Sequence, residues 1–149
     1  MSKPIYVLNG PNLNRLGKRE PEIYGKTTLA EIETMCRSAA GELPVEFRQS
    51  NAEFELVDWI HEAIDHGAGI IINAAGLTFT SIPILDALKM FPGPVFELHI
   101  TNVHRREAIY QHSLIATVAT AVIMGLGADG YRTAVEAMAR RLIPAKEGR

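Results

Sequence analysis

The sequence predicts an α/β fold in which five parallel strands form one sheet with helices on both faces. Short apolar runs alternate along the chain with segments whose apolar residues recur at helical spacing. The stretch 68–72 (Ala-Gly-Ile-Ile-Ile) is continuously apolar, which is typical of a strand buried on both faces. The chain has 149 residues, enough for one such domain and too few for two.

Each expected strand is a short run that ends at a polar residue or a chain-breaking sequence. The first ends at Asn9-Gly10-Pro11, a strong breaker. The strands are expected at residues 5–8, 44–47, 68–72, 95–100 and 119–124. Because helices separate most of them, the order predicts a flavodoxin-like three-layer sandwich over residues 1–149, with strand order 2-1-3-4-5.

The expected helices begin at recognisable capping residues. Thr28 with Glu31 and Ser50 with Glu53 match the capping-box pattern. A third helix is expected after Ser81, with a proline in its first turn. The last helix is expected from about residue 130 to residue 142, after the Gly-Leu-Gly turn at 125–127.

The composition excludes several classes of protein. A net charge of −2 at pH 7 lacks the basic excess of a nucleic-acid-binding protein. The longest apolar run, 116–127, is shorter than the roughly 20 residues of a membrane helix, and the N-terminus lacks a signal-peptide pattern. Cys36 is the single cysteine, and no His, Asp or Glu cluster has metal-ligand spacing. We therefore expect a cytoplasmic protein with no metal, membrane or nucleic-acid partner.

Polar residues follow the first four strands, and in this topology their carboxyl ends meet at one edge of the sheet. The ordinary alternative is that such residues only cap helices and turns. We favour that alternative for Ser50 and Asn51, but not for Asn73 and His99, which follow strongly apolar strands. The polar residues at this edge are Asn9, Asn12, Gln49, Ser50, Asn51, Asn73, Glu97, His99, Thr101 and Asn102.

His99 is the strongest candidate for acid–base chemistry. Glu97 lies two residues earlier, on the same side of the strand, where a carboxylate fixes the tautomer of the imidazole. A lone half-buried histidine more often has a structural role, but the pairing with Glu97 at a strand end favours catalysis. His104 and His112, which flank a basic turn, stay open as surface or site residues.

The segment 12–27 is expected to form a lid over that edge, because a long polar loop in a compact domain often does so. Tyr24 lies in it, near Arg19. A tyrosine is a poor base until a cation stabilises its phenolate, and Arg19 supplies such a charge. Alone, this pair is weak support, because exposed tyrosines and arginines are common in loops.

Several motifs together are characteristic of one enzyme family. The motif LNGPNLNRLG at 8–17 is long and specific, and REP at 19–21 and IYG at 23–25 follow it. QSN at 49–51, DWIH at 58–61, NVH at 102–104, GLG at 125–127 and GY at 130–131 match as well. Over essentially its whole length the chain resembles type II 3-dehydroquinate dehydratase.

The resemblance implies a cofactor-free, flavodoxin-like enzyme that is usually a dodecamer built from four trimers. It implies conversion of 3-dehydroquinate to 3-dehydroshikimate by anti elimination of water through an enolate. By resemblance, Tyr24 removes the proton next to the ketone, Arg19 keeps Tyr24 ionised, and Asn12 holds a water against the enolate oxygen. His99, oriented by Glu97, protonates the departing hydroxyl.

The resemblance also implies how a cyclic carboxylate substrate is held. Asn73, the backbone of Ile100, and both backbone and side chain of Thr101 would bind the substrate carboxylate. Asp86, on the third helix, resembles an aspartate that reaches the site of a neighbouring subunit. Preorganised donors then stabilise the charge that develops on the enolate. Whether the pathway is biosynthetic or catabolic stays open.

Four departures from the family pattern cluster at the end of the pocket that would recognise ring hydroxyls. The stretch after the third strand reads Asn-Ala-Ala-Gly at 73–76 instead of Asn-Pro-Gly-Ala. Phe79 stands where the family has a hydroxyl-binding histidine, and Tyr110 where it has a substrate-binding arginine, for which Arg105 or Arg106 could compensate. The fourth departure is that a usual histidine and glycine after Asn51 are replaced by Ala52 and Phe54.

Three interpretations follow. The first is a 3-dehydroquinate dehydratase that tolerates its variant pocket. The second is a paralogous lyase for a less hydroxylated cyclic carboxylate, because a site without partners for buried hydroxyls rejects a polyhydroxylated substrate. The third is a non-catalytic oligomer that binds a small acid. The joint presence of Tyr24, Arg19 and His99 counts against the third, since a binding protein needs no paired base and acid.

Overall fold

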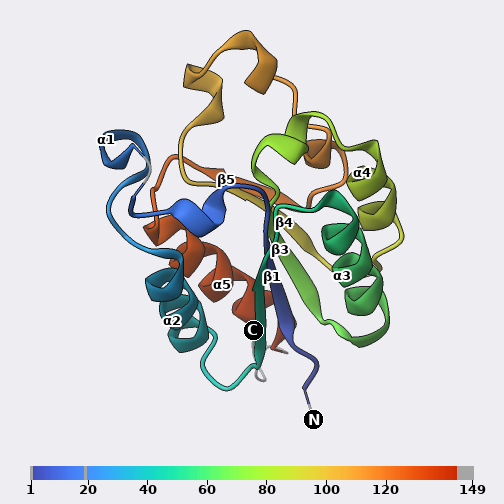
Figure 1. Cartoon of the computed structure of the whole chain (residues 1–149). Helices are drawn as coiled ribbons and strands as arrows, with labels where there is room; N and C mark the ends of the chain where they lie inside the picture. The colour runs from blue at the N-terminus through green and yellow to red at the C-terminus, as the bar shows by residue number, and fades with distance from the viewer. Residues whose placement is uncertain (1, 19, 144–149) are drawn as a thin grey trace.

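The computed structural model describes residues 2–18 and 20–143. The strands form one parallel sheet in the order β2-β1-β3-β4-β5, which confirms the predicted flavodoxin-like topology. Their carboxyl ends meet at the upper edge of the sheet in Figure 1. The strands are β1 (Ile5–Asn9), β2 (Val45–Gln49), β3 (Gly69–Asn73), β4 (Val95–His99) and β5 (Ala121–Met124).

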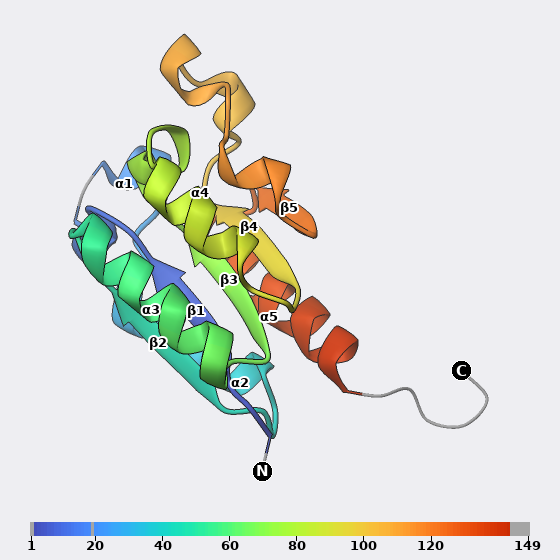
Figure 2. The same cartoon turned by 90° about the vertical axis from the view of Figure 1, so that its right-hand side faces the viewer.

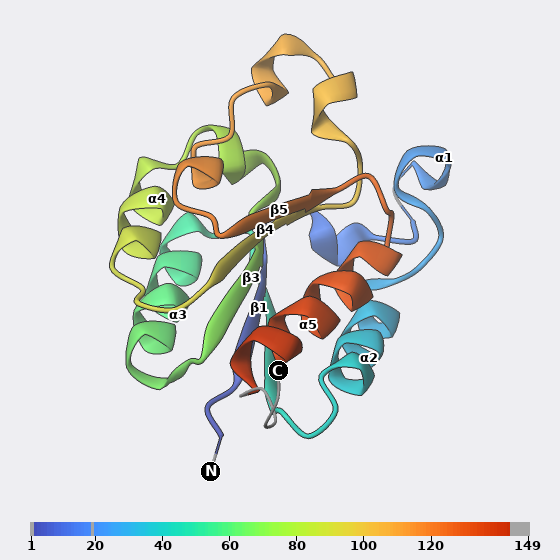
Figure 3. The same ribbon diagram turned by 180° about the vertical axis from the view of Figure 1, so that it is seen from behind.

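Two pairs of helices cover the two faces of the sheet. On one face, α2 (Leu29–Ala39) packs against α5 (Asp129–Leu142), as Figure 3 shows. On the other face, α3 (Glu53–His66) packs against α4 (Ile82–Lys89), and both lie in front of the sheet in Figure 2. The resulting three layers enclose two apolar cores, one on each side of the sheet.

The period-two alternation of strand residues explains why the central strands are apolar throughout. In β1, Ile5 and Val7 belong to the core beneath α2 and α5. Tyr6 and Leu8 belong to the core beneath α3 and α4. Because successive side chains point to opposite faces, a strand covered on both sides has no solvent-facing position, which is the pattern the sequence shows.

Two of the expected helix starts are confirmed in detail. The Thr28 hydroxyl accepts a hydrogen bond from the backbone N–H of Glu31, and the Glu31 carboxylate accepts one from the Thr28 N–H. The Ser81 hydroxyl accepts from the N–H of Ile84 at 3.0 Å. Each bond satisfies a donor that the first turn of a helix otherwise leaves unpaired.

The predicted capping box of Ser50 with Glu53 does not form. The N-cap of α3 is Ala52, which has no side chain able to accept a hydrogen bond. Ser50 instead accepts from the N–H of Ala52 at 2.9 Å and donates to the Glu55 carboxylate at 2.6 Å. The reason is that β2 continues to Gln49, so Ser50 lies in the connection that precedes the helix.

Short helical segments and turns complete the chain at the carboxyl edge of the sheet. The predicted lid region contains two of them, η1 (Leu13–Arg15) and α1 (Pro21–Tyr24). The segment between β4 and β5 projects furthest from the sheet (Figure 2). The remaining segments are η2 (Ala75–Phe79), η3 (Val103–Arg105), η4 (Ala108–Tyr110) and η5 (Ile115–Thr117).

A charged cluster links β1 and β2 to α3. Arg48 Nη2 lies 2.6 Å from Glu62 Oε2, and the Tyr6 hydroxyl donates to the same oxygen at 2.6 Å. Hydrogen bonds from Arg48 and then Tyr6 lower the pKa of Glu62 from its ordinary 4.5 to about 2. Ionised Glu62 therefore stabilises the folded chain relative to the unfolded one.

We expect the contribution of Glu62 to depend on pH. Because its folded-state pKa lies below the unfolded value, the contribution is present above about pH 4.5 and is lost as the pH falls through about 2. Glu62→Gln should lower the urea midpoint at neutral pH, and the difference from the wild type should shrink in acid. Urea titrations followed by circular dichroism check this; a difference that stays constant into acid contradicts it.

Candidate active site

A cavity of about 140 Å³ lies at the carboxyl edge of the sheet, where β1, β3 and β4 end. It is lined by residues from three segments far apart in the sequence, one after each of these strands. The structure thus brings together most of the residues that the sequence predicted for the site. Those that line the cavity are Asn12, Asn73, Phe79, His99, Ile100, Thr101 and Tyr110.

The acid–base candidate His99 is buried beside Glu97. His99 is 5% exposed and Glu97 is 1% exposed. The distance from His99 Nε2 to Glu97 Oε2 is 2.5 Å, and both side chains lie on the same face of β4 because they are two residues apart. Since Glu97 engages Nε2, Nδ1 is the ring nitrogen left to exchange a proton with a molecule in the cavity.

A chain of buried hydrogen bonds fixes the side chain of Asn73. The amide oxygen of Asn73 accepts from the N–H of Ala75 at 3.2 Å, and its amide nitrogen donates to the Tyr131 hydroxyl at 3.0 Å. Tyr131 donates to the side-chain oxygen of Asn9 at 2.7 Å, and Asn9 donates to the backbone carbonyl of Arg48 at 3.0 Å. Burial raises the pKa of Tyr131, so its hydroxyl keeps the proton that it donates.

Tyr131→Phe is expected to lower the free energy of unfolding by about 3 kcal/mol, because it leaves the donor of Asn73 and the acceptor of Asn9 unpaired where water is excluded. Tyr131 is fully buried, so no solvent replaces the lost hydroxyl. Urea unfolding measures the change. A loss below about 0.5 kcal/mol would show that the chain of hydrogen bonds contributes little.

The backbone around Asn12 is held in a conformation that is uncommon outside glycine. Asn12 has φ 73°, and its N–H donates to the Asn51 side-chain oxygen at 2.9 Å. The Gln49 side chain donates to the same oxygen at 3.2 Å and to the Gly10 carbonyl at 3.1 Å. A Cβ at Gly10 would lie 2.5 Å from the Ala74 carbonyl oxygen, so only glycine lets the ends of β1 and β3 approach this closely.

The expectation that Asn51 only caps a helix or a turn is confirmed for a turn. Its side chain holds the turn that carries Asn12 and not the start of α3, because the end of β2 lies beside the end of β1. Nothing in the local sequence distinguishes the two roles, since the partner lies 39 residues away.

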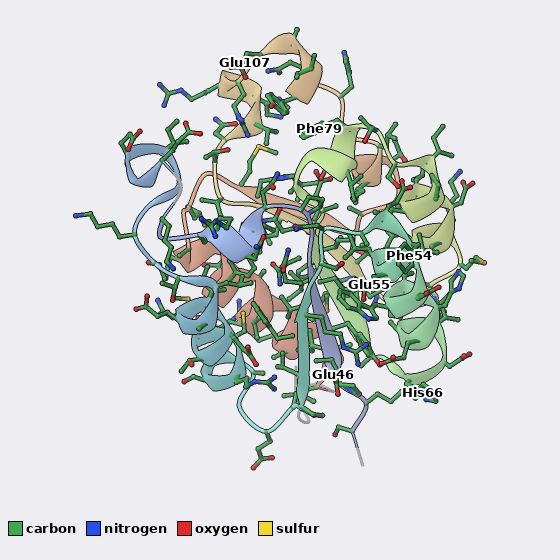
Figure 4. The ribbon with its side chains drawn as sticks, viewed as in Figure 1. Glu46, Phe54, Glu55, His66, Phe79 and Glu107 are labelled. Carbon is green, nitrogen blue, oxygen red and sulfur yellow. The ribbon has the colours of Figure 1, made fainter. Side chains whose placement is uncertain are left out.

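Aromatic rings form a wall of the cavity next to His99. The Phe79 ring stacks on the His99 ring with centroids 6.1 Å apart, and the Tyr110 ring meets Phe79 edge-on at 5.4 Å. The guanidinium of Arg106 lies 4.0 Å from the Tyr110 ring centroid. Figure 4 shows Phe79 at the end of the molecule from which the segment with Glu107 projects. Arg106, which the sequence suggests as a substitute for the missing arginine, also lines the cavity.

Of the other predicted site residues, Glu97 lies behind His99, Asp86 does not line the cavity, and two fall on parts of the lid that the structure does not describe. Arg19 lies outside the described residues, and for Tyr24 the structure describes the backbone at the end of α1 but not the side chain. Asp86 is exposed on α4, with the Lys89 ammonium 3.8 Å from its carboxylate, and it does not line the cavity. A base in the lid and an acidic group from a neighbour therefore stay predictions.

Within residues 2–18 and 20–143, no three His, Cys, Asp or Glu side chains gather as metal ligands would. In the same part of the chain, no helix combines the length and apolar character needed to cross a membrane.

Comparison with known proteins decides the family. The family model described as dehydroquinase class II matches residues 3–139. The chain belongs to the class II dehydroquinase family. This confirms the resemblance drawn from the motif at 8–17 and its companions.

Similar proteins share both sequence and fold with this class II dehydroquinase chain. A 3-dehydroquinate dehydratase of Bartonella bacilliformis is 54% identical over 144 residues, which cover 95% of this chain and 91% of that protein. One of Streptomyces avermitilis is 55% identical over 139 residues, covering 91% and 87%. The crystal structure of a type II dehydroquinase from Propionibacterium acnes has a TM-score of 0.89 and 42% identity, covering 94% of this chain and 98% of that one.

The fold is also similar to that of a protein with lower sequence identity. A 3-dehydroquinate dehydratase-like protein from Bifidobacterium longum has a TM-score of 0.69 and 30% identity, covering 93% of this chain and 97% of that one.

Proposed function

We propose that this chain dehydrates 3-dehydroquinate to 3-dehydroshikimate by anti elimination of water through an enolate. The observation that carries the proposal is the buried His99–Glu97 pair at the wall of the cavity. Relatives of about 54% identity over most of the chain are named 3-dehydroquinate dehydratase. A histidine whose second nitrogen is held by a carboxylate is suited to deliver a proton to a departing hydroxyl.

The acid half of the reaction belongs to His99. Its Nδ1 gives a proton to the hydroxyl as the carbon–oxygen bond breaks, so that water leaves instead of hydroxide. Glu97 keeps the ring in one orientation and stabilises it while it carries the positive charge.

The base half belongs to the lid. Tyr24, kept ionised by Arg19, removes the proton from the carbon next to the ketone, on the face opposite the departing hydroxyl. Asn12 holds a water that donates to the enolate oxygen as it becomes negative. The position of α1 at the same end of the molecule as the cavity supports this assignment (Figure 1).

The substrate carboxylate is held by Asn73, Ile100 and Thr101. Asn73 and the backbone after β4 lie together at the cavity wall, and the bonds to Ala75 and Tyr131 keep the Asn73 amide in one orientation. Such preorganised donors reduce the entropy lost on binding.

We also propose that the enzyme works in the cytoplasm as a dodecamer of four trimers, in which Asp86 reaches the site of a neighbouring subunit. The exposure of Asp86 and its absence from its own chain's cavity support this arrangement. Light scattering of the purified protein tests it, and a monomeric mass contradicts it.

The proposed reaction is tested by adding purified protein to 3-dehydroquinate and following the absorbance of the conjugated enone product. We expect absorbance that grows in proportion to enzyme concentration, without added metal or cofactor. Folded protein that produces no enone above the buffer rate contradicts the proposal.

The aromatic wall favours a second candidate, a paralogous dehydratase for a less hydroxylated cyclic carboxylate. Phe79 and Tyr110 present rings where ring hydroxyls would need partners, and a buried hydroxyl without a partner costs about 1–3 kcal/mol. The double change Phe79→His, Tyr110→Arg separates the two candidates. A rise of about tenfold or more in kcat/KM for 3-dehydroquinate supports the second candidate, and an unaltered value excludes it.

A further inference from the structure

We propose that Ser113 is a positioning residue for the acid pair, which it orients from outside the active-site cavity. The inference rests on the proposed function, because it assigns a task to Ser113 within the same proton transfer. Ser113 belongs to the segment between β4 and β5 and does not line the cavity that holds His99. It therefore acts through Glu97 and not by touching the substrate.

The carboxylate of Glu97 has an uneven set of partners. Its Oε2 atom lies 2.5 Å from His99 Nε2 and accepts a hydrogen bond from the Ser113 hydroxyl at 2.8 Å. Its Oε1 atom is buried and has no hydrogen-bond partner among the described residues. The orientation of the whole carboxylate thus depends on the two groups that meet at Oε2, and Ser113 is the one that does not take part in the reaction.

The direction of the Ser113 hydroxyl is also set. The backbone N–H of Ala116 donates to Ser113 Oγ at 3.0 Å, so the hydroxyl hydrogen is left to point at Glu97. An ordered series results, in which Ala116 donates to Ser113, Ser113 donates to Glu97, and His99 donates to Glu97 through Nε2. This series leaves Nδ1 as the ring nitrogen available to a molecule in the cavity that His99 lines.

Ser113 approaches the pair from a second cavity of about 660 Å³, which Glu97 also lines. His99 lines the first cavity and Glu97 lines the second. Besides the pair itself, the titratable and charged groups that line these cavities are Arg106 and Tyr110 in the first, and His104, Tyr110 and His112 in the second.

The hydrogen bond from Ser113 has a chemical consequence. It draws negative charge from Oε2, and without it the carboxylate pulls more strongly on the proton of His99. His99 then releases its proton to the leaving hydroxyl less readily. Loss of Ser113 should therefore slow the chemical step and shift its pH dependence, while substrate binding, which Ser113 does not touch, stays the same.

Two substitutions at Ser113 distinguish the effect of losing the hydroxyl from the effect of changing the size of the side chain. Ser113→Ala should lower kcat by about tenfold, the effect of losing one hydrogen bond to a charged group. Its KM should stay within about twofold of the wild type, and the alkaline limb of its pH–kcat profile should move to higher pH. Ser113→Thr keeps the hydroxyl and should restore both kcat and the profile. Wild-type kcat and an unmoved profile in Ser113→Ala overturn the proposal, as does a rise in KM alone.

A proton NMR measurement tests the same contact without turnover, so failure of the proposed function and failure of this inference give different results. The His99 Nε2 proton should give a downfield resonance in the wild type, shift in Ser113→Ala and return in Ser113→Thr, even if no enone forms. An unmoved resonance overturns the inference. If Ser113→Ala fails to fold, Ser113→Cys, which keeps the size but donates weakly, takes its place with the same expected results.

Discussion

His99→Asn is expected to lower kcat for enone formation by about a thousandfold, within the range that a general acid contributes. The asparagine amide has no proton to give to a leaving hydroxyl, and it is too short to replace Nε2 in the contact with Glu97. Loss of that buried contact should also lower the urea midpoint, so kcat is compared on protein that remains folded. The measurement is the enone absorbance at saturating substrate, together with the urea midpoint.

The matched control is His61→Asn, because His61 lies on the exposed side of α3, away from the cavity. It should keep the wild-type kcat. A His99→Asn protein that retains kcat within about threefold of the wild type would exclude His99 as the acid, whatever its position in the structure.

Tyr24→Phe is expected to abolish measurable turnover, with a loss of at least about a thousandfold in kcat, because it deletes the phenolate oxygen that we propose as the base. Binding should be retained, since the residues proposed to hold the carboxylate, Asn73, Ile100 and Thr101, lie outside the lid. Calorimetric titration with a substrate-like carboxylate tests binding, and the enone assay tests turnover.

The same variant separates an enzyme from a small-acid-binding oligomer. If the chain only binds an acid, the wild type and Tyr24→Phe bind it equally and neither forms product. Substantial turnover by Tyr24→Phe would instead require another base in the lid.

The strands were predictable from sequence because burial on both faces leaves a continuous apolar run. The predicted carboxyl ends of β1, β2 and β3 fall one or two residues before the observed ends, because polar residues continue the hydrogen-bonded strand. Asn9 pairs with both Gln49 and Asn73 in the sheet. Such residues stay in a buried strand because long-range partners satisfy their side chains, as Tyr131 does for Asn9 and Asn73.

The buried contact between Glu97 and His99 was predictable from neighbouring positions in the sequence, whereas the groups that support the site were not. Glu97 and His99 are two residues apart on one strand, so alternation alone places them on the same face. The hydrogen bonds that hold the site join residues far apart in the sequence. Asn51 and Asn12 are 39 residues apart, and Tyr131 and Asn9 are 122 residues apart. Ser113 lies 16 residues after Glu97, in a segment without a regular strand or long helix. No periodic pattern in the sequence therefore predicts their hydrogen bond.

Deuterium uptake by the substrate tests most directly whether the base and the acid are separate groups that act through an enolate. Each protein is incubated with 3-dehydroquinate in D₂O, and the label on the carbon next to the ketone is followed by mass spectrometry. His99→Asn should exchange that hydrogen faster than it releases product, and Tyr24→Phe should do neither. Exchange that persists in Tyr24→Phe, or that vanishes in His99→Asn along with product formation, would contradict the assignment.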